Sequence, residues 1–186
     1  MNGAFVPQFV VARKWPKIAE SGPKVADETA QGIVPVEPPR GMYPARLDDK
    51  GRLKLPAEFQ RYLGSLPKKR LFVTSLDRRI ATIYPIEVWK ENERLFESYT
   101  DNPDTADRVA FNAADLGSET DMDGQGRIQF STDLRRDLGI ENQPVRLQAY
   151  KGSIQVLSEA IYQARKAQAS QSPEADVKTM QRAGLK

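Results

Sequence analysis

The sequence predicts a β-rich α+β fold in which one unit of strands and short helices occurs twice. The stretch "DDKGR" at residues 48–52 returns 75 residues later as "DGQGR" at residues 123–127. After both stretches apolar and polar residues alternate, which is typical of strands with one buried face. Each half is therefore expected to run strand, turn, strand, short helix, strand, turn, strand, helix.

The strand that follows each turn is predicted from its alternation. Leu53 and Leu55 alternate with charged residues after the first turn, and Ile128 and Phe130 alternate with polar ones after the second. Pro56 then ends the first strand and suits the start of a helix. The buried pattern thus repeats together with the turn.

Serine, glycine and proline predict where helices begin and end. Ser131 offers the hydroxyl of an N-cap in the second half. Gly64 and Gly139 stand where helix C-caps are expected. After Pro85 the apolar residues of "IEVWKENERLFESY" recur at helical spacing, and residues 105–114 are expected to form a helix between the halves.

Composition divides the chain into five segments. Residues 1–38 are rich in Pro, Ala, Lys and Glu and predict a disordered N-terminal extension. Residues 166–186 are polar and predict a C-terminal tail. Between them we expect a first unit at 39–99, a connecting helical segment at 100–119 and a second unit at 120–165.

The residue inventory argues against an enzyme. The chain has no cysteine and no histidine, which removes disulfides, thiolate zinc sites and the commonest general base. No glycine-rich phosphate loop or nucleophile–base pair stands out. The aspartates near residues 48–49 and 121–123 could coordinate a hard cation, but aspartates at turns more often form the turn itself. We therefore expect no catalytic residues, no metal and no cofactor.

Charge and hydropathy indicate a polyanionic partner and no membrane. Net charge is only +3, yet residues 42–99 carry 12 basic and 8 acidic residues, whereas residues 100–119 carry one basic and 5 acidic. A polyanion responds to local charge, so the first half is expected to attract it. No apolar stretch is long enough to span a bilayer, and the apolar start contains Pro7 and lacks a leading cationic region. A cytoplasmic location is expected.

The two turns are expected to be tight and to carry one arginine each. A type I turn followed by a glycine bulge would give Gly51 and Gly126 a positive φ. Four residues are expected to shape the loops: Asp48, Gly51, Asp123 and Gly126. The simplest interpretation is that aspartate and arginine stabilise a hairpin, and repetition of the unit does not distinguish a structural role from a functional one.

Three stretches resemble the MraZ family of bacterial transcription regulators. "PRGMYPARLDDKGRLKLPAEFQ" is similar to the family's opening pattern, "LFVTSLDRRIATIYPIEVW" to its next strand pair and helix, and "MDGQGRIQFSTDLRRDLGI" to its second copy. The resemblance covers residues 39–165. Two departures are Ser131, where a proline is expected, and Gly124–Gln125, where a lysine-bearing turn is expected. The second departure predicts that the second loop contributes less to phosphate binding.

The resemblance implies a fold, an assembly and a target. It implies two AbrB/SpoVT-like units folded together as a double swapped-hairpin β-barrel, with short helices after the strand pairs. It also implies ring-like homo-oligomers that bind repeated sites in double-stranded promoter DNA of the division and cell-wall gene cluster. A repressor associated with the nucleoid is the expectation. The family's DNA-binding arginines correspond to Arg52 and Arg127.

The first loop is predicted to make most of the DNA contact. Four cations fall within nine residues there: Arg46, Lys50, Arg52 and Lys54. Arg52 is assigned to a base or groove contact and Lys50 and Lys54 to phosphate, with Arg46 as a further candidate. A solvated strand face is the alternative for Lys54. So few cations predict a weak, salt-sensitive contact that several subunits must share.

Two other functions remain open at this stage. An AbrB-like antitoxin would combine a DNA-binding barrel with a toxin-binding tail, although the tails here lack amphipathic apolar spacing. A structural oligomer without DNA binding would need the same repeated unit. A titration with promoter DNA separates the structural oligomer from a DNA-binding regulator.

Overall fold

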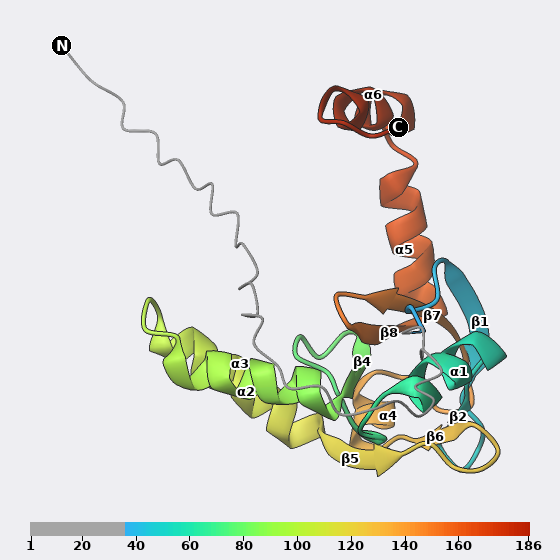
Figure 1. Ribbon diagram of the computed structural model, residues 1–186, viewed down its shortest axis with the longest axis vertical. Coiled ribbons are helices and arrows are strands. Elements are labelled where there is room, and N and C mark those ends of the chain that lie inside the picture. The colour runs from blue at the N-terminus through green and yellow to red at the C-terminus, as the bar shows by residue number, and fades with distance from the viewer. Residues whose placement is uncertain (1–35) are drawn as a thin grey trace, which may run out of the picture. The chain divides into compact units, whose positions relative to one another are not determined.

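A computed structural model of the protein describes residues 36–186 (Figure 1). The predicted N-terminal extension, residues 1–38, lies almost entirely outside the described residues. The described strands are β1 (Met42–Arg46), β2 (Arg52–Lys54), β3 (Arg70–Thr74), β4 (Ala81–Pro85), β5 (Ser118–Asp121), β6 (Arg127–Gln129), β7 (Pro144–Tyr150) and β8 (Ser153–Ser158). The described helices are α1 (Ala57–Ser65), α2 (Ile86–Ser98), α3 (Pro103–Leu116), α4 (Thr132–Asp137), α5 (Glu159–Ala169) and α6 (Pro173–Arg182).

The same order of elements occurs in both halves. The first half runs β1, β2, α1, β3, β4, α2, and the second runs β5, β6, α4, β7, β8, α5, with α3 between them. This is the order expected from the sequence, and α3 contains the helix expected over residues 105–114. The fold is therefore α+β and rich in antiparallel strands.

Strands of one half pair with strands of the other. Six strands form one antiparallel sheet in the order β1-β7-β8-β4-β3-β5, and β2 and β6 form a separate two-stranded ladder. No closed barrel is found among the described strands. The hairpin expected around the first turn is formed only near its tip, because β1 pairs with β7 and β2 with β6. The bridge between Leu47 and Leu53 and the hydrogen bonds of Asp48 join the two sides of that turn.

One hydrophobic core serves both halves. Its fully buried side chains come from the strands, from residues next to them and from the short helices α1 and α4. Among the largest are Phe59, Phe130, Leu53, Ile128, Leu134, Leu71, Ile83, Leu147 and Ile154. Burial of apolar area is the main favourable term in folding, so the two halves stabilise each other.

The helix boundaries agree with the sequence in three places and differ in one. Pro56 and Ser131 are the N-caps of α1 and α4, and the Ser131 hydroxyl accepts a 3.3 Å hydrogen bond from the Leu134 amide. Gly139 follows α4 with a φ of 62°, as expected of a C-cap glycine. The C-cap expected at Gly64 is wrong, because α1 continues through that residue to Ser65.

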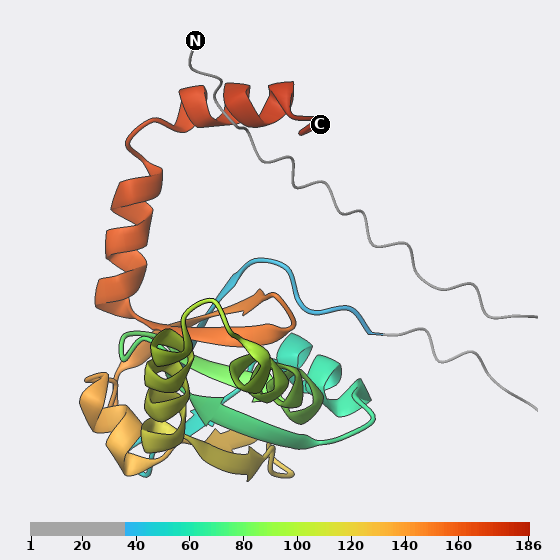
Figure 2. The same ribbon diagram turned by 90° about the vertical axis from the view of Figure 1, so that its left-hand side faces the viewer.

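Helices α2 and α3 lie side by side against the sheet (Figure 1). Trp89 of α2 is buried in a second apolar cluster, where its ring stacks on Phe72 of β3 with centroids 4.2 Å apart. Beyond β8, residues 166–186 contain the end of α5 and all of α6, and no residue of either helix is buried (Figure 2). No helix among residues 36–186 is both long and apolar enough to cross a membrane.

Candidate nucleic-acid interface

The β2–β6 ladder brings the two turns together. Its cross-strand pairs are Arg52 with Gln129, Leu53 with Ile128, and Lys54 with Arg127. The central apolar pair is fully buried, and the four polar residues alternate with it and lie on the other face. Three predicted DNA-binding residues, Arg52, Lys54 and Arg127, therefore share one surface although they come from different halves.

Loop 1, residues 48–52, is closed by the hydrogen bonds of Asp48. The Gly51 amide donates to the Asp48 carbonyl and the Asp48 amide donates to the Arg52 carbonyl, both over 3.0 Å. The carboxylate oxygen Oδ1 accepts from the amides of Lys50 and Arg52 over 3.0 and 2.8 Å. Gly51 has a φ of 75°, a region that glycine adopts without a steric cost. The predicted positive φ is confirmed.

Loop 2, residues 123–127, repeats this geometry. The Gly126 amide donates to the Asp123 carbonyl and the Asp123 amide to the Arg127 carbonyl, both over 2.9 Å. Asp123 Oδ1 accepts from the amides of Gln125 and Arg127, again over 2.9 Å. Gly126 has a φ of 71°. Asp48, Gly51, Asp123 and Gly126 thus stand where the sequence placed the loop-shaping residues.

Each loop aspartate also holds its arginine. Nε of Arg52 donates to Asp48 Oδ2 over 2.7 Å, and Nη2 lies at the same distance from that oxygen. In loop 2, Nε of Arg127 donates to Asp123 Oδ2 over 2.8 Å. The Arg52 side chain lowers the pKa of the Asp48 carboxyl, whereas the Arg127 backbone amide is the main cause that lowers the pKa of Asp123.

The paired arginines still reach the surface. The Arg52 and Arg127 side chains keep 30% and 27% of their area exposed. Both aspartates accept a hydrogen bond from Nε of their arginine, and neither arginine hydrogen-bonds through Nη1 to a described residue. The aspartate–arginine pair therefore stabilises the turn, as the simplest interpretation of the sequence has it. At the same time it fixes the direction of a partly exposed guanidinium.

Lys54 and Gln129 cross from one half to the loop of the other. The Lys54 ammonium donates to the Gln125 carbonyl in loop 2. The Gln129 amide donates to the Lys50 carbonyl in loop 1 over 3.0 Å. The sequence grouped Lys54 with loop 1, but the structure places it against loop 2. Lys54 thus places a lysine beside loop 2, which has none of its own.

Lys50 and Arg46 occupy different positions around the ladder. Lys50 lies exposed in loop 1, and its ammonium pairs with no other residue in the range 36–186. Arg46 ends β1, and its Nη2 donates to the Asn142 carbonyl over 2.9 Å. Arg46 and Lys54 border the same shallow groove of about 480 Å³. The two residues can therefore contact one extended ligand, with Arg46 at the edge of the surface.

The sequence did not reveal two residues beneath the loops, Gln60 of α1 and Arg135 of α4. A Cβ added to Gly51 would lie 2.4 Å from Cζ of Arg135, and one added to Gly126 would lie 2.2 Å from Cδ of Gln60. A side chain at either glycine would therefore clash with a residue from the other half. The available signal was the 75-residue offset, which also relates Gln60 to Arg135.

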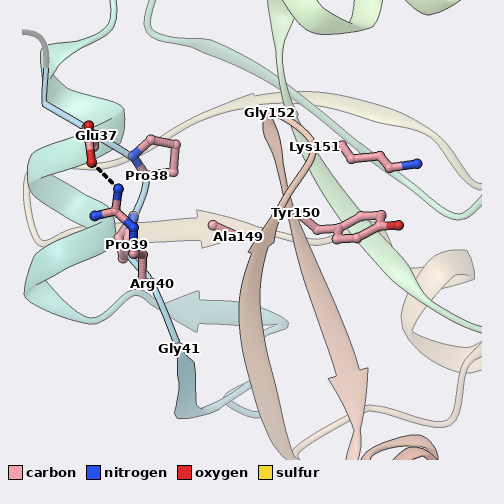
Figure 3. A pocket seen from close by; sticks show the side chains of 9 residues that line it. All are labelled: Glu37, Pro38, Pro39, Arg40, Gly41, Ala149, Tyr150, Lys151 and Gly152. Carbon is pink, nitrogen blue, oxygen red and sulfur yellow. Dashed lines mark hydrogen bonds and ion pairs between the residues drawn. The ribbon is translucent and has the colours of Figure 1, made fainter. Parts of the chain in front are cut away.

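A separate cavity lies beside the β7–β8 turn. It measures about 520 Å³ and lies between residues 37–41 and the β7–β8 turn (Figure 3). Arg40 pairs there with Glu37, while the Lys151 ammonium points away from Arg40 and lies 5.3 Å from the Tyr150 ring centroid (Figure 3). Within residues 36–186, no group of three or more acidic side chains is placed to hold a metal ion.

The chain is similar to several curated transcriptional regulators named MraZ. It is 39% identical over 100 residues to that of Acidobacterium capsulatum, covering 52% of this chain and 66% of the relative. It is 33% identical over 105 residues to that of Koribacter versatilis, covering 56% and 71%. It is 36% identical over 110 residues to that of Nitrosospira multiformis, covering 57% and 72%. No protein-family model matches the chain.

Geometry and similarity lead to the same classification. Two loops of equal geometry, held side by side by strands from both halves, place the chain among proteins that present paired arginine-bearing loops on a β-rich scaffold. The chain belongs to the MraZ family, because relatives at 33% and 36% identity match it over more than two thirds of their own length.

Proposed function

We propose that this protein is a sequence-specific DNA-binding transcription regulator. The observation that carries the proposal is the β2–β6 ladder, where Arg52, Lys54 and Arg127 share one exposed face beside two loops of the same geometry. Loops that present arginine and lysine in a fixed direction suit the phosphates and base edges of a duplex. The names of the relatives, all transcriptional regulators, support the same function.

The residues are assigned roles by the nitrogens they leave available. Arg52 takes a base or groove contact through Nη1, since Asp48 fixes the rest of its guanidinium. Lys50 and Lys54 take phosphate contacts in loop 1 and loop 2. Arg127 contacts the duplex beside Lys54, and Arg46 contacts phosphate at the edge of the surface.

The proposed scaffold is an AbrB-like swapped-hairpin barrel built from two units, residues 39–99 and 120–165. Strands β1 and β5 are the edges of the six-stranded sheet. Loop 1 connects β1 to β2 and loop 2 connects β5 to β6, so the β2–β6 ladder lies next to both edges. Such an arrangement leaves few unpaired strand edges. Residues 100–119 link the units, and residues 1–38 and 166–186 act as extensions.

The proposed assembly is a ring-like homo-oligomer. Leu95 of α2 and Phe111 of α3 expose 56% and 66% of their areas, and Tyr99 is also exposed near them in the chain. Exposed large apolar side chains on two neighbouring helices are suited to contacts between subunits. Because each chain offers few cations, several subunits on repeated promoter sites would add their affinities.

The proposed target follows the family. It is promoter DNA of the division and cell-wall gene cluster, read in the cytoplasm at the nucleoid, with repression as the outcome. Of the alternatives, an antitoxin would bind a toxin as well as DNA, and a structural oligomer would bind no DNA.

The decisive experiment is a gel-shift titration of the protein with a duplex from the upstream region of its own operon, with footprinting to locate the contacts. We expect protection of repeated short sites. We also expect the logarithm of the affinity to fall against the logarithm of salt concentration with a slope of about −3 to −4 per chain, one unit for each cation on phosphate. Absence of binding, or a flat salt response, would overturn the proposed function.

A further inference from the structure

Each loop carries as many acidic as basic residues of its own. Loop 1 has Asp48 and Asp49 against Lys50 and Arg52, and loop 2 has one aspartate against one arginine. The loops alone therefore have no net positive charge to attract a polyanion. Any excess charge at either loop must come from residues elsewhere in the chain.

Arg135 lies directly beneath loop 1. Its guanidinium is packed against the α-carbon of Gly51, and only 8% of the residue is exposed. Nε donates to the Ser131 carbonyl over 3.3 Å, and Nη2 donates to the Thr132 hydroxyl over 3.0 Å. These bonds hold the side chain in place from within α4, so the backbone of loop 1 rests on a rigid support.

The positive charge of Arg135 is only partly compensated. Its two hydrogen-bond acceptors are neutral oxygens. Nη1 lies 3.7 Å from Oε1 of Glu141, and the same oxygen lies 3.8 Å from Nε of Arg136. One carboxylate shared by two guanidinium groups leaves one positive charge in this group. Because Arg135 is buried, its field is less screened by water than that of an exposed residue.

We propose that Arg135 is a positioning residue for loop 1 and the source of that loop's excess positive charge toward DNA phosphate. In loop 2 these two roles belong to two residues. Gln60 packs beneath Gly126, and the Lys54 ammonium adds a positive charge next to the loop. Each loop thus depends on the other half for its charge. This inference rests on the proposed DNA-binding function.

The first test is Arg135→Gln, which gives loop 1 the neutral support that loop 2 has in Gln60. Affinity for the promoter duplex is expected to fall about two- to sixfold, the effect of one charge acting on phosphate over roughly 8 Å at an effective dielectric constant of about 40 to 80. The salt slope should fall by less than about one unit, because Arg135 touches no phosphate itself. Lys54→Gln, as the matched control, should lower the slope by about one unit.

The second test separates charge from support. Asp49→Asn removes an exposed acid from loop 1 and restores the loop's charge in the Arg135→Gln background. Most of the lost affinity should return, whereas no recovery would show that Arg135 acts by support alone and would overturn the assignment of charge. Gln60→Arg, which places a cation beneath loop 2, should strengthen binding, and unchanged or weaker binding would count against the proposal.

The controls distinguish failure of the proposed DNA-binding function from failure of the inference about Arg135. Thermal unfolding of each variant shows whether it folds. If Arg135→Gln is unfolded, Asp49→Asn and Gln60→Arg in the wild-type background still test the charge. If the wild-type protein binds no duplex, the proposed function fails. If the wild-type protein binds but all three substitutions leave affinity unchanged, only the inference about Arg135 fails.

Discussion

Loop 1 and loop 2 share a backbone and differ in their charges. The corresponding hydrogen bonds of the two loops agree within 0.1 Å, and the glycine φ angles are 75° and 71°. The side chains at equivalent positions differ: Lys50 corresponds to Gln125, Asp49 to Gly124, and the support is Arg135 in one and Gln60 in the other. Aspartate, glycine and arginine therefore set the shape, and other residues set the charge.

The largest expected effect concerns the core that the two halves share. Phe59 of α1 and Leu134 of α4 are related by the 75-residue offset, and both are fully buried. Truncation to alanine should lower the free energy of unfolding by about 3–5 kcal/mol for Phe59→Ala and about 2–5 kcal/mol for Leu134→Ala. Urea unfolding followed by circular dichroism and, in a Trp15→Phe background, by the fluorescence of Trp89 measures both losses of stability.

The same experiment tests whether the halves unfold together. Since strands of both halves form one sheet, both probes should show a single transition in each variant. A Leu134→Ala protein in which the Trp89 region stays folded while the rest unfolds would show that the halves are independent. Met180→Ala is the control, because that side chain of α6 is 55% exposed and should change stability by less than about 0.5 kcal/mol.

The second prediction compares the loop glycines. Gly51→Ala and Gly126→Ala should each cost about 1–2 kcal/mol of stability, because an L-residue is strained at positive φ. Gly51→Ala should cost about 1 kcal/mol more, since the Arg135 guanidinium beneath it is buried and held by two hydrogen bonds. Thermal unfolding measures the difference. Gly124→Ala, which meets no atom within 4 Å, is the control, and an equal loss there would contradict this explanation.

The shape of each loop could be predicted from the sequence because it depends on neighbours within five residues. Asp48 and Gly51 determine the turn through bonds that span at most four positions. Ser131 as an N-cap and Gly139 as a C-cap are local in the same way. The predicted C-cap at Gly64 was wrong because a helix tolerates glycine in its last turn, and no neighbouring residue ends α1 there.

The composition of the surface could not be predicted from local rules. Lys54 contacts loop 2 through Gln125, 71 positions away, because β2 pairs with β6 instead of with β1. A polar residue on a helix face is ordinarily exposed, so no local rule indicates that Arg135 is buried beneath Gly51. Both contacts depend on how strands of the two halves pair, and this pairing cannot be predicted from the spacing of residues within one loop.

The third prediction concerns the two loop arginines. Arg52→Ala should weaken promoter binding by about 1–3 kcal/mol and by more than Arg127→Ala does, because Lys50 and Arg135 reinforce loop 1. The oligomer should remain intact in size-exclusion chromatography. Fluorescence anisotropy with a labelled duplex measures both affinities.

The reverse ranking has a specific meaning. Both aspartates bind Nε of their arginines in the same way, so the two guanidinium groups are held alike. A greater loss from Arg127→Ala would therefore contradict the proposed ranking of the two loops. Negligible losses from both would remove the arginines from the interface. Arg52→Lys, which keeps the charge but cannot reproduce the planar contact, separates charge from geometry.

The smallest expected effect is the dependence of stability on acid. The pKa of Asp48 and that of Asp123 lie below the ordinary value of 3.8 because arginine groups bond to the carboxylates. A pKa that is lower in the folded state than in the unfolded state adds stability above the unfolded value, and this contribution is lost as pH falls from about 4 toward the folded pKa. At pH 7 Asp48→Asn and Asp123→Asn should therefore unfold at lower temperatures than the wild-type protein, and the difference should shrink below pH 4. Below pH 4 the unfolding temperature of Asp48→Asn should also change less than that of the wild type. A difference in unfolding temperature that is constant from pH 7 to pH 3 would show that the Asp48 carboxylate charge does not stabilise loop 1.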